Sequence, residues 1–146
     1  DNIEFLIQTN IGEIEKPLIK IASGGEMSRI MLGIKKVLAD IDEVPILIFD
    51  EIDTGISGIA AKKVGIKMKE ISKKHQVICV THLAPIAAKG DYNYFIQKEV
   101  KDNKTNTKIE QLDEEGTLKE IARIASGEIN EISINHAKEL RKEKVA

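Results

Sequence analysis

Two short apolar runs, each followed directly by polar residues, constrain the fold of this chain most strongly. Ile46–Phe49 precedes a pair of carboxylates, and Val77–Val80 precedes Thr81 and His82. A run that is apolar on both faces is typical of a parallel strand covered by helices. The segment between the two runs is long enough for the crossover helix that a parallel pair requires. The sequence therefore predicts a strand–helix–strand unit of an α/β fold, with parallel core strands flanked by helices.

The segments on either side of this unit extend the predicted fold. Ser23 and the two glycines after it open an amphipathic helix that runs to residue 38, whereas Gly65 weakens the helix expected between the core strands. A polar stretch over 101–106 predicts an antiparallel hairpin between strands 92–100 and 107–112. The first helix is expected to bury Met27, Ile30, Met31, Ile34, Val37 and Leu38. The other expected elements are a strand over 3–8, helices over 57–74, 118–126 and 130–144, and a short helix or turn over 83–89.

The composition is typical of a globular protein rather than a disordered or membrane-spanning one. Of the 146 residues, 42% are hydrophobic and 32% are charged. No apolar run approaches the ~20 residues that cross a bilayer, so no membrane partner is expected. The net charge of −2 supplies no overall attraction to nucleic acid, although it is compatible with a local basic patch.

A single cysteine restricts the redox chemistry of the chain. Cys79 lies inside the second apolar run, which predicts a small buried core residue rather than a reactive thiol and excludes an internal disulfide. One cysteine and no signal peptide predict a cytoplasmic location. Because the sequence opens on strand-like residues without an initiator Met, we expect it to be a piece of a longer protein.

The first candidate motif is Ser23-Gly24-Gly25-Glu26, which immediately precedes the amphipathic helix. Free backbone N–H groups at the positive end of a helix dipole, together with glycines that allow close approach, favour a phosphate site. The alternative is an ordinary capping box, in which the Ser side chain and the Glu three positions later satisfy the helix N-terminus. The motif alone leaves both interpretations open.

The second candidate motif is the adjacent pair Asp50 and Glu51 after the first core strand. Ligands of open α/β sheets bind at the carboxyl ends of the strands, where these two side chains lie. Asp50 can hold a hydrated Mg²⁺, and Glu51 can orient or deprotonate a water for attack on phosphorus. The alternative is two solvated loop carboxylates after a core strand.

The third candidate motif, Thr81-His82, follows the second core strand and can donate to a phosphate oxygen. A single His at a strand end is more often structural or simply exposed, and that alternative stays open. His75 and His136 receive no role. The three histidines show no metal-ligand spacing, so a zinc site is not expected.

In this order the three motifs resemble the signature motif, the Walker B motif with its catalytic glutamate, and the switch histidine of ABC-type ATPases. Three longer stretches, 22–31, 49–58 and 81–88, resemble the RecN family of bacterial DNA repair proteins, which are SMC-like ATPases. The resemblance implies a P-loop NTPase head fragment in which residues 1–146 form the C-terminal part. It also implies recombinational repair of DNA double-strand breaks, and association with the nucleoid during that work.

The resemblance implies a role for each motif. Two heads sandwich two ATP molecules in the family, so the signature residues would contact the nucleotide bound by the partner head of a homodimer. Asp50 would hold Mg²⁺ through water, Glu51 would act on the attacking water, and His82 would sense the γ-phosphate. ATP and Mg²⁺ are thus the implied cofactors, and DNA is an implied partner.

The chain departs from the general ABC pattern in two places. The D-loop region comprises Asp53, Thr54, Gly55 and Ser57, but Ser57 stands where the general D-loop has an aspartate, so that aspartate's role is assigned to no residue here. The phosphate-cradling motif of Walker A is absent, because no Gly is followed by Lys. We therefore expect the chain alone to bind ATP weakly and to need the N-terminal Walker A half of the same protein.

Two other functions stay open at the level of sequence. Another ABC-type ATPase subunit, such as that of a transporter, would share the three motifs, although Ile52 and Asp53 replace the Pro-Thr that transporters usually place after the glutamate. A head that only dimerises and does not hydrolyse ATP is the other alternative. The presence of Glu51 and His82 argues against it, because a site without catalysis has no chemical need for them.

Overall fold

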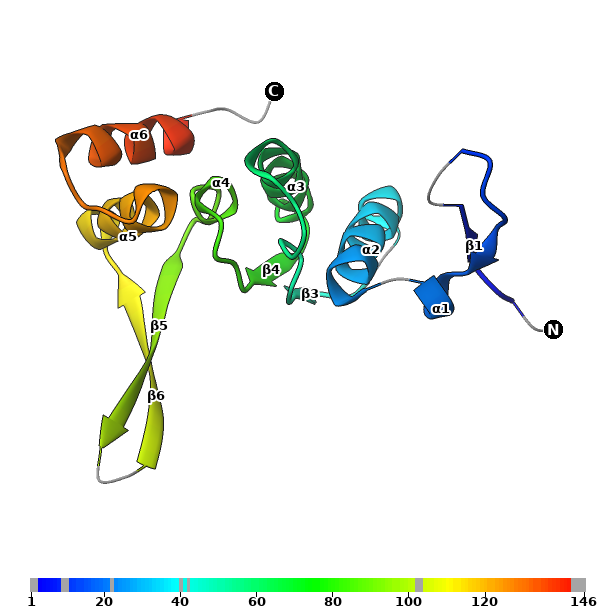
Figure 1. Cartoon of the computed structure of the whole chain (residues 1–146), viewed down its shortest axis with the longest axis horizontal. Helices are drawn as coiled ribbons and strands as arrows, with labels where there is room; N and C mark the ends of the chain where they lie inside the picture. Colours follow the sequence, from blue (N-terminus) through cyan, green and yellow to red (C-terminus); the bar gives the residue numbers. More distant parts are fainter. Residues whose placement is uncertain are drawn as a thin grey trace.

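The computed structural model describes residues 3–8, 11–21, 23–39, 41, 43–101 and 104–142. Its elements follow one another from one end of an elongated molecule to the other (Figure 1). In chain order they are β1 (Leu6–Ile7), β2 (Lys16–Pro17), α1 (Leu18–Ile21), α2 (Gly24–Leu38), β3 (Ile46–Phe49), α3 (Gly58–Ile71), β4 (Gln76–Cys79), α4 (Ala84–Ala87), β5 (Asn93–Lys101), β6 (Lys104–Leu112), α5 (Glu114–Ser126) and α6 (Glu131–Lys142).

The strand–helix–strand prediction is confirmed. β3 and β4 pair in parallel with Ile46 opposite Gln76 and Phe49 opposite Cys79, and α3 makes the crossover. The ladder continues one residue further, because the Val80 N–H donates to the Phe49 carbonyl at 3.1 Å. Both strands consequently end at the same edge of the sheet, which brings the two polar strand-end segments together.

Within the described residues, the helices that flank the strands cover one face of the pair. Leu47 and Phe49 are buried beneath α2 and α3, whereas Ile46 and Ile48 on the opposite face are 47% and 69% exposed. Figure 1 shows both helices on the same side of the strand pair. Because successive side chains of β3 point to opposite faces of the sheet, its face opposite the helices is apolar and exposed. Ile78 and Val80, in and just after β4, extend this open face.

The buried face of α2 also differs from the prediction. Leu32, outside the predicted set, is 4% exposed and joins the core, whereas Val37 is 83% exposed and Met31 is 38% exposed. Leu32 lies outside the apolar stripe of this amphipathic helix, so periodicity alone did not identify the side that meets the sheet. Met27 and Met31 instead line a groove of about 230 Å³ beside the open face of β3.

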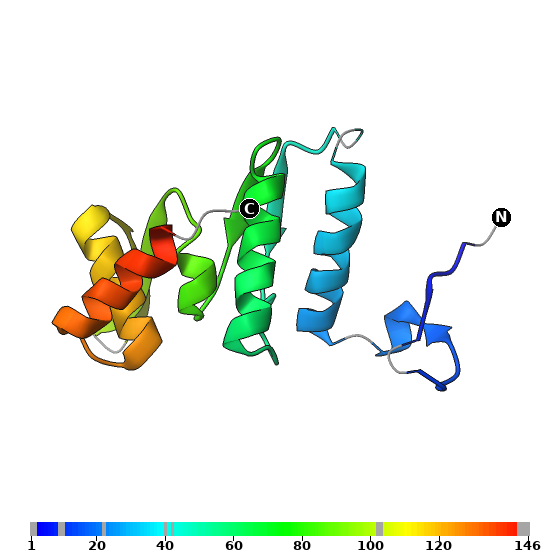
Figure 2. The same cartoon turned by 90° about the horizontal axis from the view of Figure 1, so that it is seen from above.

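Gly65 has a packing role that the sequence reasoning treated only as a weakness of the helix. A Cβ at this position would lie 3.0 Å from the Pro85 carbonyl oxygen and 3.4 Å from the Cα of Ile86. The absence of a side chain at Gly65 therefore lets α4 pack closely on α3. The axes of α3 and α2 run side by side (Figure 2). The core around this layer comprises Leu32, Leu47, Phe49, Ile52, Ala61, Met68, Ile71 and Ile86.

The C-terminal part is a long hairpin followed by two packed helices. β5 and β6 pair as far as Lys101 and Lys104, so the connection is shorter than the predicted 101–106 loop. α5 begins four residues earlier than predicted because the Asp113 carboxylate accepts the Gly116 N–H at 2.7 Å, and it ends at Gly127 in the left-handed region (φ 77°). α6 ends at Lys142, and positions 143 and 144 of the predicted helix lie outside the described residues.

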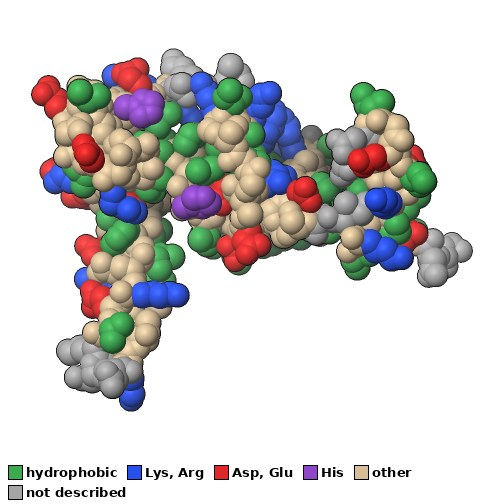
Figure 3. Space-filling model, in the orientation of Figure 1, with side chains coloured by type: hydrophobic (Ala, Val, Ile, Leu, Met, Phe, Trp, Pro, Cys, Tyr) green, Lys and Arg blue, Asp and Glu red, His purple; other side chains and the backbone are tan. Residues whose placement is uncertain are grey.

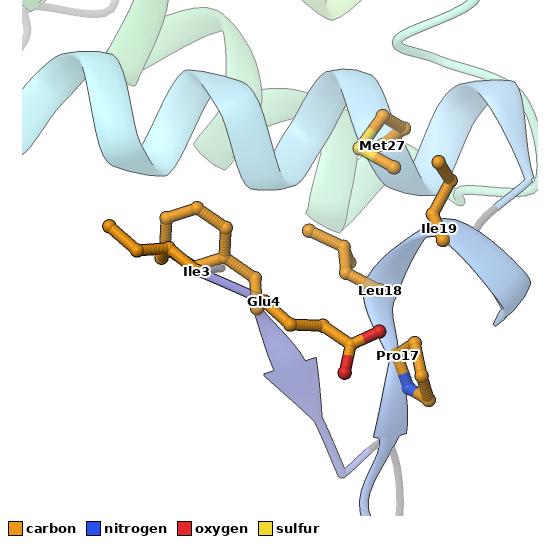
Figure 4. A pocket seen from close by; sticks show the side chains of 7 residues that line it. Ile3, Glu4, Pro17, Leu18, Ile19 and Met27 are labelled. Carbon is orange, nitrogen blue, oxygen red and sulfur yellow. The ribbon is translucent and has the colours of Figure 1, made fainter. Parts of the chain in front are cut away.

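The N-terminal strand is shorter than the predicted 3–8. Within the described part of this segment, Leu6–Ile7 pairs with Lys16–Pro17. The segment forms an apolar groove of about 540 Å³ with the start of α2 (Figure 4). The side chains that line this groove include Ile3, Phe5, Leu18, Ile19 and Met27.

Charge is distributed unevenly over the surface. Between Gly58 and Lys74 the sequence carries six Lys and one Glu, although the whole chain has a net charge of −2. Figure 3 shows basic side chains gathered along the upper edge, over α3. Within the described ranges no helix combines the length and apolar character needed to cross a bilayer.

Candidate functional site

The polar segments after β3 and β4 meet at the carboxyl edge of the sheet. A single oxygen of Asp53, Oδ2, accepts hydrogen bonds from the Thr81 hydroxyl at 2.6 Å and the His82 backbone N–H at 2.8 Å. The His82 Nδ1 atom lies 3.1 Å from the same oxygen. The Asp53 side chain is 3% exposed, whereas that of His82 is 73% exposed. A buried carboxylate thus anchors one edge of an exposed imidazole.

The loop between β3 and α3 is held in an unusual backbone conformation. Asp50 Oδ1 accepts the Glu51 N–H at 2.9 Å, and the Thr54 N–H donates to the Glu51 carbonyl at 3.0 Å. Glu51 has φ 56°, a left-handed conformation that costs a non-glycine residue about 1 kcal/mol or more. Strain of this kind persists only where surrounding contacts enforce it, and it is concentrated at functional sites.

Two side chains of α2 supply those enforcing contacts. The Ser28 hydroxyl donates to the Asp50 carbonyl at 2.8 Å. Arg29 Nη1 donates to the carbonyls of Ile52 and Thr54 at 3.1 and 2.8 Å. The helix that follows the signature motif therefore fixes the backbone on which both candidate carboxylates lie.

The start of α2 is a capping box, as the alternative interpretation of the first motif predicted. The Ser23 hydroxyl oxygen accepts the Glu26 N–H at 3.3 Å, and Glu26 Oε2 accepts the Ser23 N–H at 3.0 Å. The cap uses only the acceptor capacity of the hydroxyl, so its O–H can still donate. The first intrahelical bond runs from Met27 N–H to the Ser23 carbonyl, which leaves the N–H groups of the two glycines before it outside the helical ladder. The cap is therefore compatible with binding an anion.

The structure brings the signature motif and Glu51 into direct proximity. A Cβ built on Gly24 would lie 2.3 Å from Glu51 Oε2, and one built on Gly25 would lie 2.8 Å from the Glu51 carbonyl oxygen. At Gly25 the neighbour is backbone, so only glycine fits there, whereas at Gly24 the neighbour is the end of a flexible side chain. The family resemblance assigns these two elements to different nucleotides, so their contact within one chain was not anticipated.

The carboxylates at this edge also influence Cys79. Burial raises the pKa of the Cys79 thiol to about 12, and the negative charges of Asp53 and Asp50 add to the shift. The residue is only partly buried, yet its thiol is kept protonated at neutral pH. The prediction of an inert core cysteine agrees with this environment.

The donor set does not form a resident metal site. No group of three or more His, Cys, Asp or Glu suited to a metal occurs among the residues that the structure describes. Asp50 is exposed and contributes a single carboxylate. One carboxylate fits a hydrated Mg²⁺ that is also held by nucleotide phosphates, because Mg²⁺ usually keeps several waters.

Three of the residues that shape this site were missed by sequence reasoning, or were named without their role. Ser28 and Arg29 had no assignment, and Asp53 was named only as part of the D-loop region. Their contacts span 22 to 29 positions of sequence, so local patterns did not reveal them. Ser57, from the same region, is exposed and precedes α3 without making a side-chain capping bond.

The chain resembles known DNA repair proteins in sequence. It is 44% identical over 144 residues to the DNA repair protein RecN of Bacillus subtilis (strain 168), which covers 98% of the chain. RecN of Treponema pallidum (strain Nichols) is 47% identical and that of Haemophilus influenzae 43% identical, each over 96% of the chain. The chain is therefore similar to one segment of RecN. No protein-family model matches it.

The RecN-like chain spans about a quarter of the length of these relatives, 25% in each of the three. A solved structure described as "Structural biochemistry of ATP-driven dimerization and DNA stimulated activation of SMC ATPases" aligns with 81% of the chain and 70% of its own length. The alignment has a TM-score of 0.52 and 25% sequence identity. The likeness agrees with the predicted SMC-type ATPase head fragment.

Proposed function

We propose that this RecN-like chain is the C-terminal half of an ATPase head that hydrolyses ATP at a head–head interface during recombinational repair of DNA double-strand breaks. The supporting observation is the single edge at which Asp50, Glu51 and His82 lie beside the start of α2. Carboxylates, an imidazole and a helix N-terminus at the carboxyl edge of a parallel sheet suit phosphoryl transfer.

The side chains divide the chemistry between two nucleotides. Asp50 would hold hydrated Mg²⁺, and the exposed Glu51 carboxylate would take a proton from the attacking water. The outward nitrogen of His82 would contact the γ-phosphate of the nucleotide bound by the same head. Ser23 and the glycine N–H groups of α2 would contact the nucleotide of the second head, with the helix dipole stabilising its negative charge.

A Walker A half of the same protein would complete the head. Two features support this part of the proposal: the chain lacks a Gly-Lys pair, and one face of the β3–β4 pair is open. Exposed apolar patches of this kind mark surfaces that another protein segment covers. The chain alone should therefore bind ATP weakly.

The DNA partner is proposed from the relatives and from charge. The relatives are named DNA repair proteins, and the similar solved structure concerns DNA-stimulated activation. The concentration of Lys on and after α3 is a surface suited to a polyanion. With DNA as a partner, we also propose that the protein is cytoplasmic and associates with the nucleoid.

The test is ATP turnover by the full-length protein, and by this chain co-expressed with its Walker A half, with and without linear duplex DNA. Turnover that requires both halves, rises with DNA and disappears in Glu51→Gln supports the proposal. Turnover that ignores DNA would retain the ATPase and contradict the repair assignment. No turnover from a folded, associated mixture would favour a head that only dimerises.

A further inference from the structure

We propose that Asp53 is a positioning residue that orients His82 for the nucleotide. The inference rests on the proposed function, in which His82 contacts the γ-phosphate. It assigns to Asp53 a role distinct from that of the general D-loop aspartate, whose position is occupied by Ser57. Asp53 itself touches no reacting atom in this arrangement and acts through the imidazole.

The contacts of Asp53 fix both the backbone and the ring of His82. The backbone N–H and Nδ1 of His82 lie 2.8 and 3.1 Å from the same carboxylate oxygen, Oδ2. Thr81 extends the arrangement, because its hydroxyl donates to Asp53 and accepts the Leu83 N–H at 3.1 Å. The turn after β4 is therefore built around one buried carboxylate.

This geometry selects a form of the imidazole. A carboxylate only accepts hydrogen bonds, so its position 3.1 Å from Nδ1 favours the tautomer that carries the proton on that atom. The other nitrogen, Nε2, is then directed away from Asp53 on a side chain that is 73% exposed. Partners on one ring nitrogen commonly set the tautomer and orientation of a functional histidine. Asp53 therefore presents Nε2, rather than Nδ1, to the nucleotide.

The burial of Asp53 supports a dedicated role. A carboxylate that is 3% exposed loses most of its hydration and needs strong hydrogen bonds in return. Within the described ranges its salt-bridge-distance neighbour is the ring of His82, and no Lys or Arg is paired with it. Charge-assisted hydrogen bonds are roughly twice as strong as neutral ones, so an amide at this position would hold the ring less firmly.

The test compares Asp53→Asn, Asp53→Leu, His82→Gln and the double variant Asp53→Asn/His82→Gln in the full-length protein. Asp53→Asn should lower kcat about tenfold with KM for ATP within about twofold, since only the orientation of His82 is disturbed. Asp53→Leu, which removes the acceptor, should lower kcat further. The double variant should be no slower than His82→Gln alone, because Asp53 acts through that ring.

Asp91→Asn is the matched control, because it makes the same chemical change at an exposed carboxylate that pairs with Lys69 and not with His82. It should leave turnover unchanged. Wild-type turnover in Asp53→Asn, losses that multiply in the double variant, or an unchanged His82→Gln would each overturn the inference while leaving the ATPase proposal intact.

A second measurement does not depend on turnover. In protein labelled with ¹⁵N-histidine, the signals that disappear in His82→Gln belong to this ring. We expect them to report a protonated Nδ1 in the neutral imidazole, and to shift toward a tautomer mixture in Asp53→Asn. If the wild-type protein hydrolyses no ATP, the proposed function fails, and this spectrum still decides whether Asp53 orients His82. Identical spectra in the two proteins would reject that role.

Discussion

Adding one methyl group at Gly24 should impair catalysis without unfolding the protein. The new Cβ would lie 2.3 Å from Glu51 Oε2, more than 1 Å closer than the roughly 3.5 Å of ordinary non-bonded contact. Because the clashing atom is the end of a flexible, exposed side chain, the Glu51 carboxylate can move aside at little cost in stability. We therefore expect Gly24→Ala to retain its unfolding free energy within about 0.5 kcal/mol.

The displaced carboxylate should be a poorer base. A shift of about 1 Å in a reacting group can cost on the order of a hundredfold in rate, so ATP turnover of the full-length Gly24→Ala protein should fall by one to two orders of magnitude. The assay is steady-state ATP hydrolysis, paired with urea unfolding on the same preparations. Wild-type turnover in a stable Gly24→Ala protein would refute the reasoning about the position of Glu51.

Two further glycines of α2 serve as controls for this variant. At Gly25 the added Cβ meets the backbone carbonyl of Glu51 at 2.8 Å and Thr54 Cβ at 3.0 Å, so Gly25→Ala should lose about 1–3 kcal/mol of stability. At Gly33 a Cβ meets nothing within 4 Å, so Gly33→Ala should gain about 0.5–1 kcal/mol and leave turnover unchanged. Equal stabilities for these two variants would contradict the packing described for the start of α2.

Three other outcomes follow from local contacts. With its pKa raised to about 12, the Cys79 thiol should react with Ellman's reagent at pH 8 about a thousandfold more slowly than in urea, and a fast native reaction would contradict its burial. Asp113→Ala should cost about 1 kcal/mol in urea unfolding by removing the cap of α5, whereas Asp113→Asn should restore most of it. Ion pairs with Lys36 and Lys67 lower the pKa of Glu70, so the stability difference between wild type and Glu70→Gln should be present at pH 7 and vanish as the pH falls through the lowered pKa. A difference that persists at pH 2 would rule out that linkage.

The sequence predicted the central unit of the fold because its signals are local. Four apolar residues in a row define β3, and the carboxylates after it fall at the sheet edge for any parallel strand. The sequence also contains a signal for the early start of α5, because Asp113 precedes two acidic residues and a helical pattern. That segment was predicted too short because its first turn is polar.

The features that were wrong or missed depend on contacts between distant residues. Hydrophobicity of Ile48 indicates that the side chain is suited to burial, but it does not say which segment covers it. In the sequence Arg29 is an ordinary helix residue. Only the structure shows that its guanidinium donates to two carbonyls more than twenty positions away. The likeness to RecN supplied the names of the motifs, whereas the link from Asp53 to His82 required coordinates.

The open face of the β3–β4 pair also bears on how such a head is assembled. If the covering segment belongs to the same polypeptide, a long intervening region costs little at equilibrium, because each doubling of a flexible loop adds only about 0.6 kcal/mol of closure entropy. Contacts between segments distant in sequence nevertheless form slowly, so Ile46 and Ile48 would stay exposed during synthesis until the two halves meet. A tether raises the effective concentration of the covering half and shortens this interval. We therefore expect separately expressed halves to need co-expression to remain soluble, whereas the tethered protein should fold without that help.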